Sequence, residues 1–222
     1  MRLVITDLTE MQGGNFCVAG WDAAGGRMVR PLPDGRNWTA GLLARHAILP
    51  GATVDVHPVG RPEKSRYPHR SEDALVDRDR IRRIEAAPID WLGEEGPPAG
   101  MTLAAAFDGQ LHHTDLRGGV CHGLHVPADL PVHSLGALEL PRSLIRFAVD
   151  HDKLRLMLND GDGRYSLAVS SLALKTAWRD GGIDAVLRAL PKSHLLHIRL
   201  GLARPFGQPP DKCYVMINGI EG

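Results

Sequence analysis

Short runs of apolar and β-branched residues alternate with glycine-rich turns through the first sixty positions of the chain. Because turn residues bound these runs, the pattern predicts several strands rather than a long helix. Strands are expected at residues 2–6, 16–21, 27–30 and 51–59, with Pro31 and Pro33 ending the third. Before the fourth strand, residues 39–46 are expected to form a short helix in which Thr39 is the N-cap.

The middle of the chain has weaker periodicity and more polar side chains. Residues 60–73 are expected to form a polar, basic loop. Residues 79–87 are expected to form a helix with Ile81 and Ile84 on its buried side, ended by Pro88. From 93 to 141 glycine, proline and histidine are frequent, which indicates an irregular connector with short pieces of structure.

The last third of the chain has the clearest pattern. Strands are expected at 144–149, 153–158, 164–169, 194–202 and 213–217, with a hairpin turn at 159–163. Residues 170–190 have helical spacing that is interrupted at Gly181 and Gly182. The order strand, strand, strand, helix, strand, strand is that of an OB-fold, a five-stranded and partly open barrel.

The first sixty residues follow the same order as far as the fourth strand, so the sequence predicts a pair of barrels. The expected fold class is mostly β with a few helices, built as two OB-like barrels. We expect an N-terminal barrel at 1–95, an irregular connector at 96–141 and a C-terminal barrel at 142–222.

Composition narrows the possible partners of the protein. The 222 residues include 26 Lys plus Arg and 26 Asp plus Glu, so the formal net charge is zero. Any nucleic-acid site must therefore be a local basic patch, because the overall field gives no attraction. The three cysteines are odd in number and far apart in sequence, which predicts a cytoplasmic protein. A charged residue close to the N-terminus argues against a signal peptide, and no apolar run is long enough to predict a membrane span. No cofactor motif is present, so no cofactor is expected.

Three sets of short strings carry a family resemblance. Residues 17–21 (Cys-Val-Ala-Gly-Trp) are followed by Met-Val-Arg-Pro at 28–31, and Pro-His-Arg-Ser-Glu-Asp occupies 68–73. The third set is Leu-Gly-Leu-Ala-Arg-Pro-Phe at 200–206 with Tyr-Val-Met-Ile-Asn-Gly-Ile at 214–220. Together they resemble the dual OB-containing domain family of bacterial proteins. The resemblance implies two barrels and a nucleic-acid or nucleotide role, and it does not extend to the histidine-rich middle of the chain.

Candidate nucleic-acid-binding residues fall in two places. The polar loop contains Arg66, His69 and Arg70 with Tyr67 among them, and a tyrosine can stack on a base while arginine holds phosphate. The alternative is a solvated loop whose arginines pair with nearby acids. Arg30 and Arg204 each precede a proline at the end of an expected strand, where they would project from a barrel rim. The alternative there is an arginine that caps carbonyls or pairs with a carboxylate.

If the protein binds nucleic acid, we expect Arg30, Arg66, Arg70 and Arg204 to form one patch, since a neutral protein must concentrate its positive charge.

Candidate catalytic and metal-binding residues are sparser. His69, Glu72 and Asp73 would suit a metal-dependent phosphoesterase or nuclease, although a salt-bridged turn explains the same residues. His113, Cys121 and His125 have ligand chemistry suited to zinc, but paired ligand spacing is missing and no structural zinc is expected.

Three functional hypotheses remain open from the sequence. The first is a binding module for single-stranded nucleic acid or a nucleotide, the second is the phosphoesterase or nuclease, and the third is a protein-interaction domain with no ligand of its own.

Overall fold

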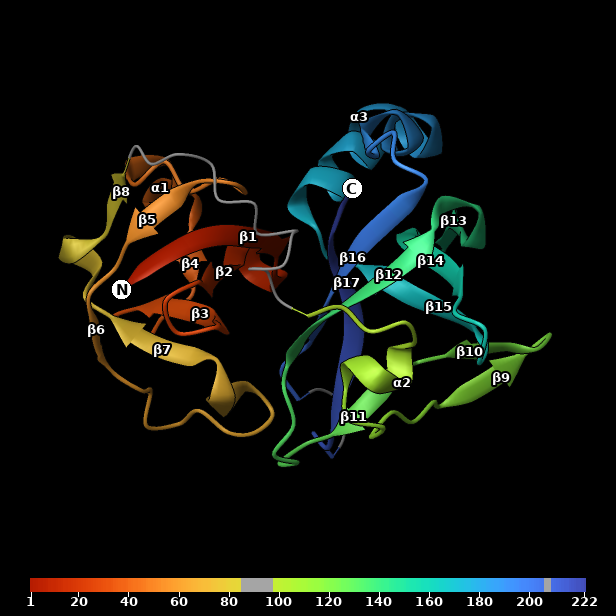
Figure 1. Ribbon diagram of the computed structural model, residues 1–222, viewed down its shortest axis with the longest axis horizontal. Helices are drawn as coiled ribbons and strands as arrows, with labels where there is room; N and C mark the ends of the chain where they lie inside the picture. The colour runs from red at the N-terminus through yellow and green to blue at the C-terminus, as the bar shows by residue number, and fades with distance from the viewer. Residues whose placement is uncertain (85–97, 206–208) are drawn as a thin grey trace. The chain divides into compact units, whose positions relative to one another are not determined.

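The computed structural model describes residues 1–84, 98–205 and 209–222 (Figure 1). The chain divides into two compact units, one made of Met1–Arg66 with Glu72–Pro97 and the other of Tyr67–Ser71 with Pro98–Gly222. Five residues of the loop that was expected at 60–73 therefore belong to the second unit, although the chain on both sides of them belongs to the first.

The first unit is a curled sheet with one α-helix among its described residues. Its elements are β1 (Arg2–Glu10), β2 (Asn15–Asp22), β3 (Arg27–Pro33), β4 (Trp38–Thr39), α1 (Ala40–Arg45), β5 (Thr53–Asp55), β6 (Pro58–Gly60), β7 (Asp73–Val76) and β8 (Arg82–Ile84). The sheet order is β6-β7-β3-β2-β1-β5-β8, and β4 pairs with β2. Only two residues separate β5, which pairs with β1, from β6, which pairs with β7, so this stretch connects the two ends of the strand order β1-β2-β3-β7.

The first two expected strands and the short helix are confirmed, whereas the fourth, expected at 51–59, is divided into β5 and β6. Thr39 caps α1, its hydroxyl accepting a hydrogen bond from the amide of Leu42 at 3.3 Å. The third strand continues past Arg30, where it was expected to end, and its last residue is Pro33. β3 pairs with β2 only up to Val29, and its last four residues pair with β7 alone. Prolines are tolerated there because that end of the strand is hydrogen-bonded on one side.

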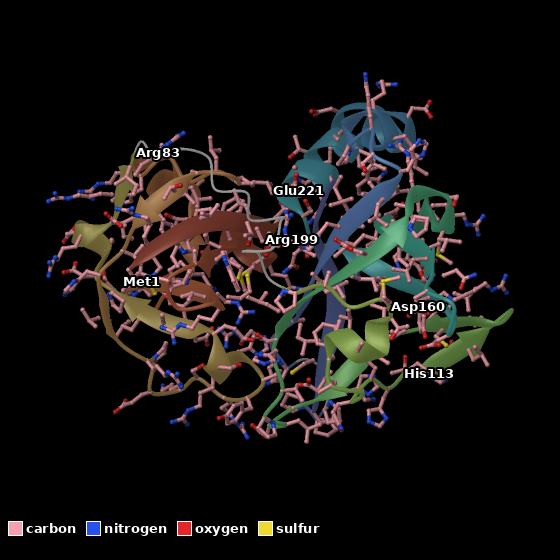
Figure 2. The ribbon with its side chains drawn as sticks, in the orientation of Figure 1. Met1, Arg83, His113, Asp160, Arg199 and Glu221 are labelled. Carbon is pink, nitrogen blue, oxygen red and sulfur yellow. The ribbon has the colours of Figure 1, made fainter. Side chains whose placement is uncertain are left out.

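The helix expected at 79–87 is wrong for the residues that the structure describes. Arg78–Arg80 form one 3-10 turn, and β8 pairs with β5 as the edge strand of the sheet. Residues 85–87 lie outside the described residues. β5 offers an unpaired edge that β8 can extend, and this tertiary pairing outweighs the helical spacing of Ile81 and Ile84. Arg83 extends from β8 to the surface of the first unit (Figure 2).

The second unit contains every strand and the helix that were expected in the last third of the chain. Its elements are α2 (Leu103–Ala106), β9 (Asp115–Arg117), β10 (Val120–His122), β11 (His125–Pro127), β12 (Leu135–Pro141), β13 (Ile145–Asp150), β14 (Lys153–Asn159), β15 (Arg164–Val169), α3 (Leu172–Ala189), β16 (Leu195–Leu202) and β17 (Lys212–Glu221). The backbone of α3 departs from helical angles at Gly181 and Gly182, as the glycine pair predicts.

This sheet also curls until its two ends are joined by one stretch of chain. The sheet order includes β12-β16-β17-β15, and β14 pairs with both β15 and β13. β12 runs into β13 through one 3-10 turn at Arg142–Leu144, so consecutive strands pair with β16 and with β14. Residues 98–141, which fall in the expected connector, belong to the second unit and supply α2 and β9 to β12.

The two units share a connectivity, which confirms a mostly β fold with two curled sheets. In each, a three-stranded antiparallel meander precedes a helix, and the third strand of the meander pairs in parallel with a strand that follows the helix, as β3 does with β7 and β15 with β17. The core of the second unit is aliphatic, and Leu156, Leu196 and Ile198 are fully buried in it. No helix within 1–84, 98–205 or 209–222 is long and apolar enough to cross a bilayer.

Truncating this core tests the sheet arrangement. We expect Leu156→Ala to lower the free energy of unfolding by about 2–5 kcal/mol, because it removes buried methyl groups and leaves a cavity. Leu195→Ala, at a side chain that is 46% exposed, should change it by less than about 0.5 kcal/mol. Urea denaturation of both variants checks this, and equal shifts in their midpoints would contradict the assigned core.

Candidate functional site

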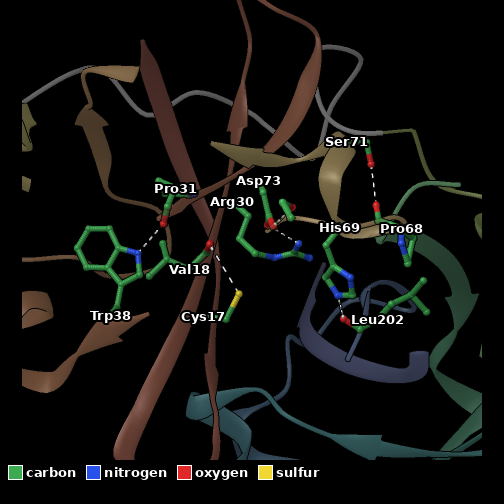
Figure 3. A network of polar contacts seen from close by, with 11 residues as sticks. Cys17, Val18, Arg30, Pro31, Trp38, Pro68, His69, Ser71, Asp73 and Leu202 are labelled. Atoms are coloured by element: carbon green, nitrogen blue, oxygen red, sulfur yellow. Dashed lines mark hydrogen bonds and ion pairs between the residues drawn. The ribbon is translucent and has the colours of Figure 1, made fainter. Parts of the chain in front are cut away.

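The segment Tyr67–Ser71 is fixed within the second unit by a buried histidine. The His69 side chain is only 2% exposed, and its Nε2 lies 2.9 Å from the carbonyl oxygen of Leu202 at the end of β16 (Figure 3). Because a carbonyl can only accept, Nε2 carries a hydrogen and donates it. His69 is therefore an anchor for its own segment, and its Nε2 is not directed at solvent.

Two further hydrogen bonds hold the same segment. The amide of Asp129 donates to the carbonyl oxygen of Tyr67 at 3.1 Å, and the Ser71 hydroxyl donates to the carbonyl oxygen of Pro68 at 2.8 Å. With the backbone held in this way, Tyr67 is 38% exposed and Arg70 is exposed. The segment therefore presents one aromatic and one cationic side chain on the surface of the second unit.

A row of three aromatic rings crosses neighbouring backbones of the same unit. His125 on β11 lies opposite Tyr214 on β17, and His112 exchanges both backbone hydrogen bonds with His125 at 2.9 Å. The ring centroids of His112 and His125 are 5.9 Å apart, and those of His125 and Tyr214 are 5.7 Å apart, with tilts of 33° and 54°. These values lie within the range of attractive aromatic pairs, so the rings support one another.

The ring row and the anchored segment lie along one short stretch of chain. Pro127, the last residue of β11, pairs with Lys212, and the amide of Ala128 donates to the carbonyl oxygen of Asp211. The amide of the next residue, Asp129, donates to the carbonyl oxygen of Tyr67. The amide of Ala203 donates to the carbonyl oxygen of Tyr214 at 2.8 Å, which brings Arg204 beside this row. We call this set the stacking strip, and it consists of Tyr67, Arg70, His112, His125, Arg204 and Tyr214.

The pKa of the buried Cys213 thiol depends on burial and on nearby charged side chains. Burial raises the pKa of the Cys213 thiol to about 11 because it disfavours the thiolate. The nearby Arg204 opposes this shift and Asp129 adds to it. Both charges therefore act within a short distance of Cys213 on β17.

Arg30 does not project from a barrel rim, and that expectation is wrong. Its side chain is 4% exposed, and Nη1 lies 3.1 Å from Oδ1 of Asp73 (Figure 3). Ser65 donates to the other oxygen of Asp73 at 2.5 Å. Burial alone would lower the pKa of the Arg30 guanidinium, but Cys17, Asp73 and Glu72 raise it above its ordinary value on balance. Arg30 is the arginine paired with a carboxylate that the sequence left as the alternative.

The four-arginine patch therefore loses one of its members. Arg66 is exposed in the first unit, whereas Arg70 and Arg204 belong to the second. A patch made of these three stays a prediction. Only Arg70 and Arg204 have their places within the stacking strip.

The three candidate acid/base residues, His69, Glu72 and Asp73, are all buried. His69 lies in the second unit, whereas Glu72 and Asp73 are buried residues of the first, and Asp73 is engaged by Arg30 and Ser65. Glu72 and Asp73 are thus part of the first unit's interior rather than of an exposed salt-bridged turn.

The three zinc candidates lie on different segments of the second unit. His113 is exposed, Cys121 pairs with Tyr165 on the neighbouring strand, and His125 belongs to the ring row. Among the residues that the structure describes, no three His, Cys, Asp or Glu side chains are grouped closely enough to hold a metal ion.

Sequence reasoning missed His112 and Tyr214 as site residues. Only a weak local pattern indicates Tyr214 as a surface residue: it lies between Cys213 and Val215, which are both buried, so its side chain faces away from the core. Its pairing with His125 joins positions far apart in the chain, which no local pattern reveals. Comparisons of the sequence with protein-family models and with curated proteins find no match.

The buried ion pair can be tested by removing one partner. We expect Asp73→Ala to lower the free energy of unfolding by about 3–5 kcal/mol, because it leaves the Arg30 guanidinium buried without its carboxylate. Asp55→Ala breaks an exposed pair with Arg2 and should cost less than about 1 kcal/mol. Chemical denaturation compares the two, and a loss at Asp73 no larger than that at Asp55 would contradict the buried pair.

Proposed function

We propose that the protein binds single-stranded nucleic acid and that the stacking strip of the second unit contacts the bases. The observation that carries the proposal is the alignment of His112, His125 and Tyr214 in one row, joined to exposed Tyr67 through residues 125–129. His125 is itself buried, so exposed His112 and half-buried Tyr214 on either side of it are the rings open to a base. Every base has a π-face, so such rings bind unpaired bases with little regard to sequence.

The charges around the rings fit the same ligand. Arg70 is exposed three residues after Tyr67, and Arg204 follows Ala203, whose amide donates to the carbonyl oxygen of Tyr214. A guanidinium can hold a phosphate with two hydrogen bonds, which suits contacts to a backbone that passes over stacked bases. Because the chain has a net charge of zero, such local arginines must provide the attraction for phosphates.

We further propose that both units are OB-like barrels. The meander, the helix that follows it and the parallel contact between its third strand and a later strand support this assignment in each unit. OB-folds commonly bind oligonucleotides on their strands and loops. The resemblance to the dual OB-containing domain family implies the same role and adds to the proposal.

The other two hypotheses have less support. A metal-dependent phosphoesterase needs convergent carboxylates, and Asp73 is instead engaged by Arg30 and Ser65. A protein-interaction domain without a ligand would leave the ring row with a purely structural role. The binding experiment below separates that outcome from the proposed one.

Fluorescence anisotropy with a labelled single-stranded oligonucleotide of about 15 nucleotides tests the proposal. We expect Tyr214→Ala to weaken binding by about 1–3 kcal/mol because it removes one stacking surface. Tyr214→Phe keeps the ring and should bind as the wild type does. A duplex should bind more weakly than the single strand, because its bases are already stacked inside the helix.

Two results would count against stacking at the strip. One is equal affinity of wild type and Tyr214→Ala for the single strand when both proteins show the same thermal unfolding. The other is the absence of binding to single-stranded DNA and RNA at low salt, which would favour the interaction-domain hypothesis.

A further inference from the structure

The first unit carries a cluster of arginines that the stacking strip does not explain. Four arginines fall within residues 78–83, on the 3-10 turn and on β8, and all four are exposed. Two more lie beside them, since Arg45 of α1 contacts Asp79 at 4.0 Å and Arg2 of β1 contacts Asp55 at 3.6 Å. We call this set the arginine edge, and it consists of Arg2, Arg45, Arg78, Arg80, Arg82 and Arg83.

Strand register explains why these side chains gather. Asp55 of β5 lies opposite Arg2 of β1 on one side and opposite Arg82 of β8 on the other. Directly opposed residues of antiparallel strands share a face, so Arg2 and Arg82 flank Asp55 on the outer face of the sheet. Arg83 points to the other face of β8, where its Nη1 donates to the carbonyl oxygen of Ala47 at 3.4 Å.

The carboxylates around the edge engage only some of the arginines. Asp34 and Asp79 contact Arg78, at 3.4 and 3.9 Å, while Asp77 accepts a hydrogen bond from the Asp79 amide. Asp55 and Asp79 also contact Arg2 and Arg45, as described above. Within the part of the chain that the structure describes, Arg80 and Arg82 make no ion pair or side-chain hydrogen bond. Among the residues that the structure describes, six arginines against Asp34, Asp55, Asp77 and Asp79 leave the edge positive.

We propose that the arginine edge is a second contact surface for the same nucleic acid and that it binds the phosphate backbone without contacting bases. The inference rests on the proposed function for its ligand, but it depends on a different unit and a different interaction. The arginines of the edge attract phosphate through charge, and this attraction is independent of base sequence. Charged residues on an edge strand also discourage strand-to-strand aggregation, and this purely structural role predicts no ligand dependence.

An abasic oligonucleotide of about 15 units isolates the phosphate contribution, because it keeps the phosphates and lacks the bases. We expect Arg80→Ala/Arg82→Ala in the full chain to weaken binding of this probe on the order of tenfold at low salt. Losing two phosphate contacts should also reduce the slope of log Kd against log salt by about 1.4. Tyr214→Ala should leave binding of the abasic probe unchanged.

The matched control is Arg146→Ala/Lys153→Ala, which removes two exposed positive charges from the β13–β14 hairpin of the second unit. The control should bind the abasic probe as the wild type does. Equal weakening by the control and by Arg80→Ala/Arg82→Ala would overturn the edge as a specific surface, since overall charge would then explain the effect.

The two proposals can fail separately. If Tyr214→Ala weakens binding of ordinary single-stranded DNA while Arg80→Ala/Arg82→Ala binds both probes normally, the arginine edge is overturned and the stacking strip stands. If the arginine variant loses the abasic probe while Tyr214→Ala binds ordinary DNA normally, the edge stands and the stacking strip is overturned. If the wild type binds neither the abasic nor the ordinary oligonucleotide, both proposals are overturned.

Discussion

The buried ion pair between Arg30 and Asp73 closes the sheet of the first unit and sets the path of the chain around it. A buried guanidinium is tolerated only with a partner, so Asp73 must lie opposite Arg30, and this fixes the register of β7 against β3. The Arg30 amide donates to the carbonyl oxygen of Glu72 at 2.8 Å, which holds the residue just before β7. Immediately before Glu72, the chain belongs to the second unit. The pair therefore holds the point at which the chain returns to the first unit.

In the second unit, uncharged groups hold the parallel strands β15 and β17 together. The Ser170 hydroxyl, at the end of β15, lies 2.9 Å from the carbonyl oxygen of Ile217 and 3.0 Å from the side-chain oxygen of Asn218 on β17. With β17 held against β15 at one end, its other end is available to pair with β11, and that pairing aligns Tyr214 with His125. The stacking strip is thus a consequence of how the sheet closes. Its rings are carried by backbone pairing, which makes it a more rigid surface than a loop.

Local pattern predicted much of the fold and little of the site. The five strands of the last third and the broken helix α3 follow from residue spacing and from Gly181 and Gly182, which act locally. β8 could not be foreseen, because Ile81 and Ile84 have helical spacing and only the free edge of β5 makes a strand there. Pro31 indicated an extended Arg30, but nothing local shows that its side chain turns inward to Asp73. The ring row joins residues from separate strands, so its assembly depends on tertiary register alone.

Photocrosslinking tests the central claim most directly, because it reports which side chains touch the bases. A single-stranded oligonucleotide carrying iodouracil bases would be bound to the wild-type protein, irradiated and digested for peptide mapping. The account predicts cross-links in the peptides that contain Tyr67, His125 or Tyr214, and their loss when unlabelled single strand competes. Cross-links confined to other peptides, with the strip unmodified at saturating oligonucleotide, would contradict the claim that bases stack there.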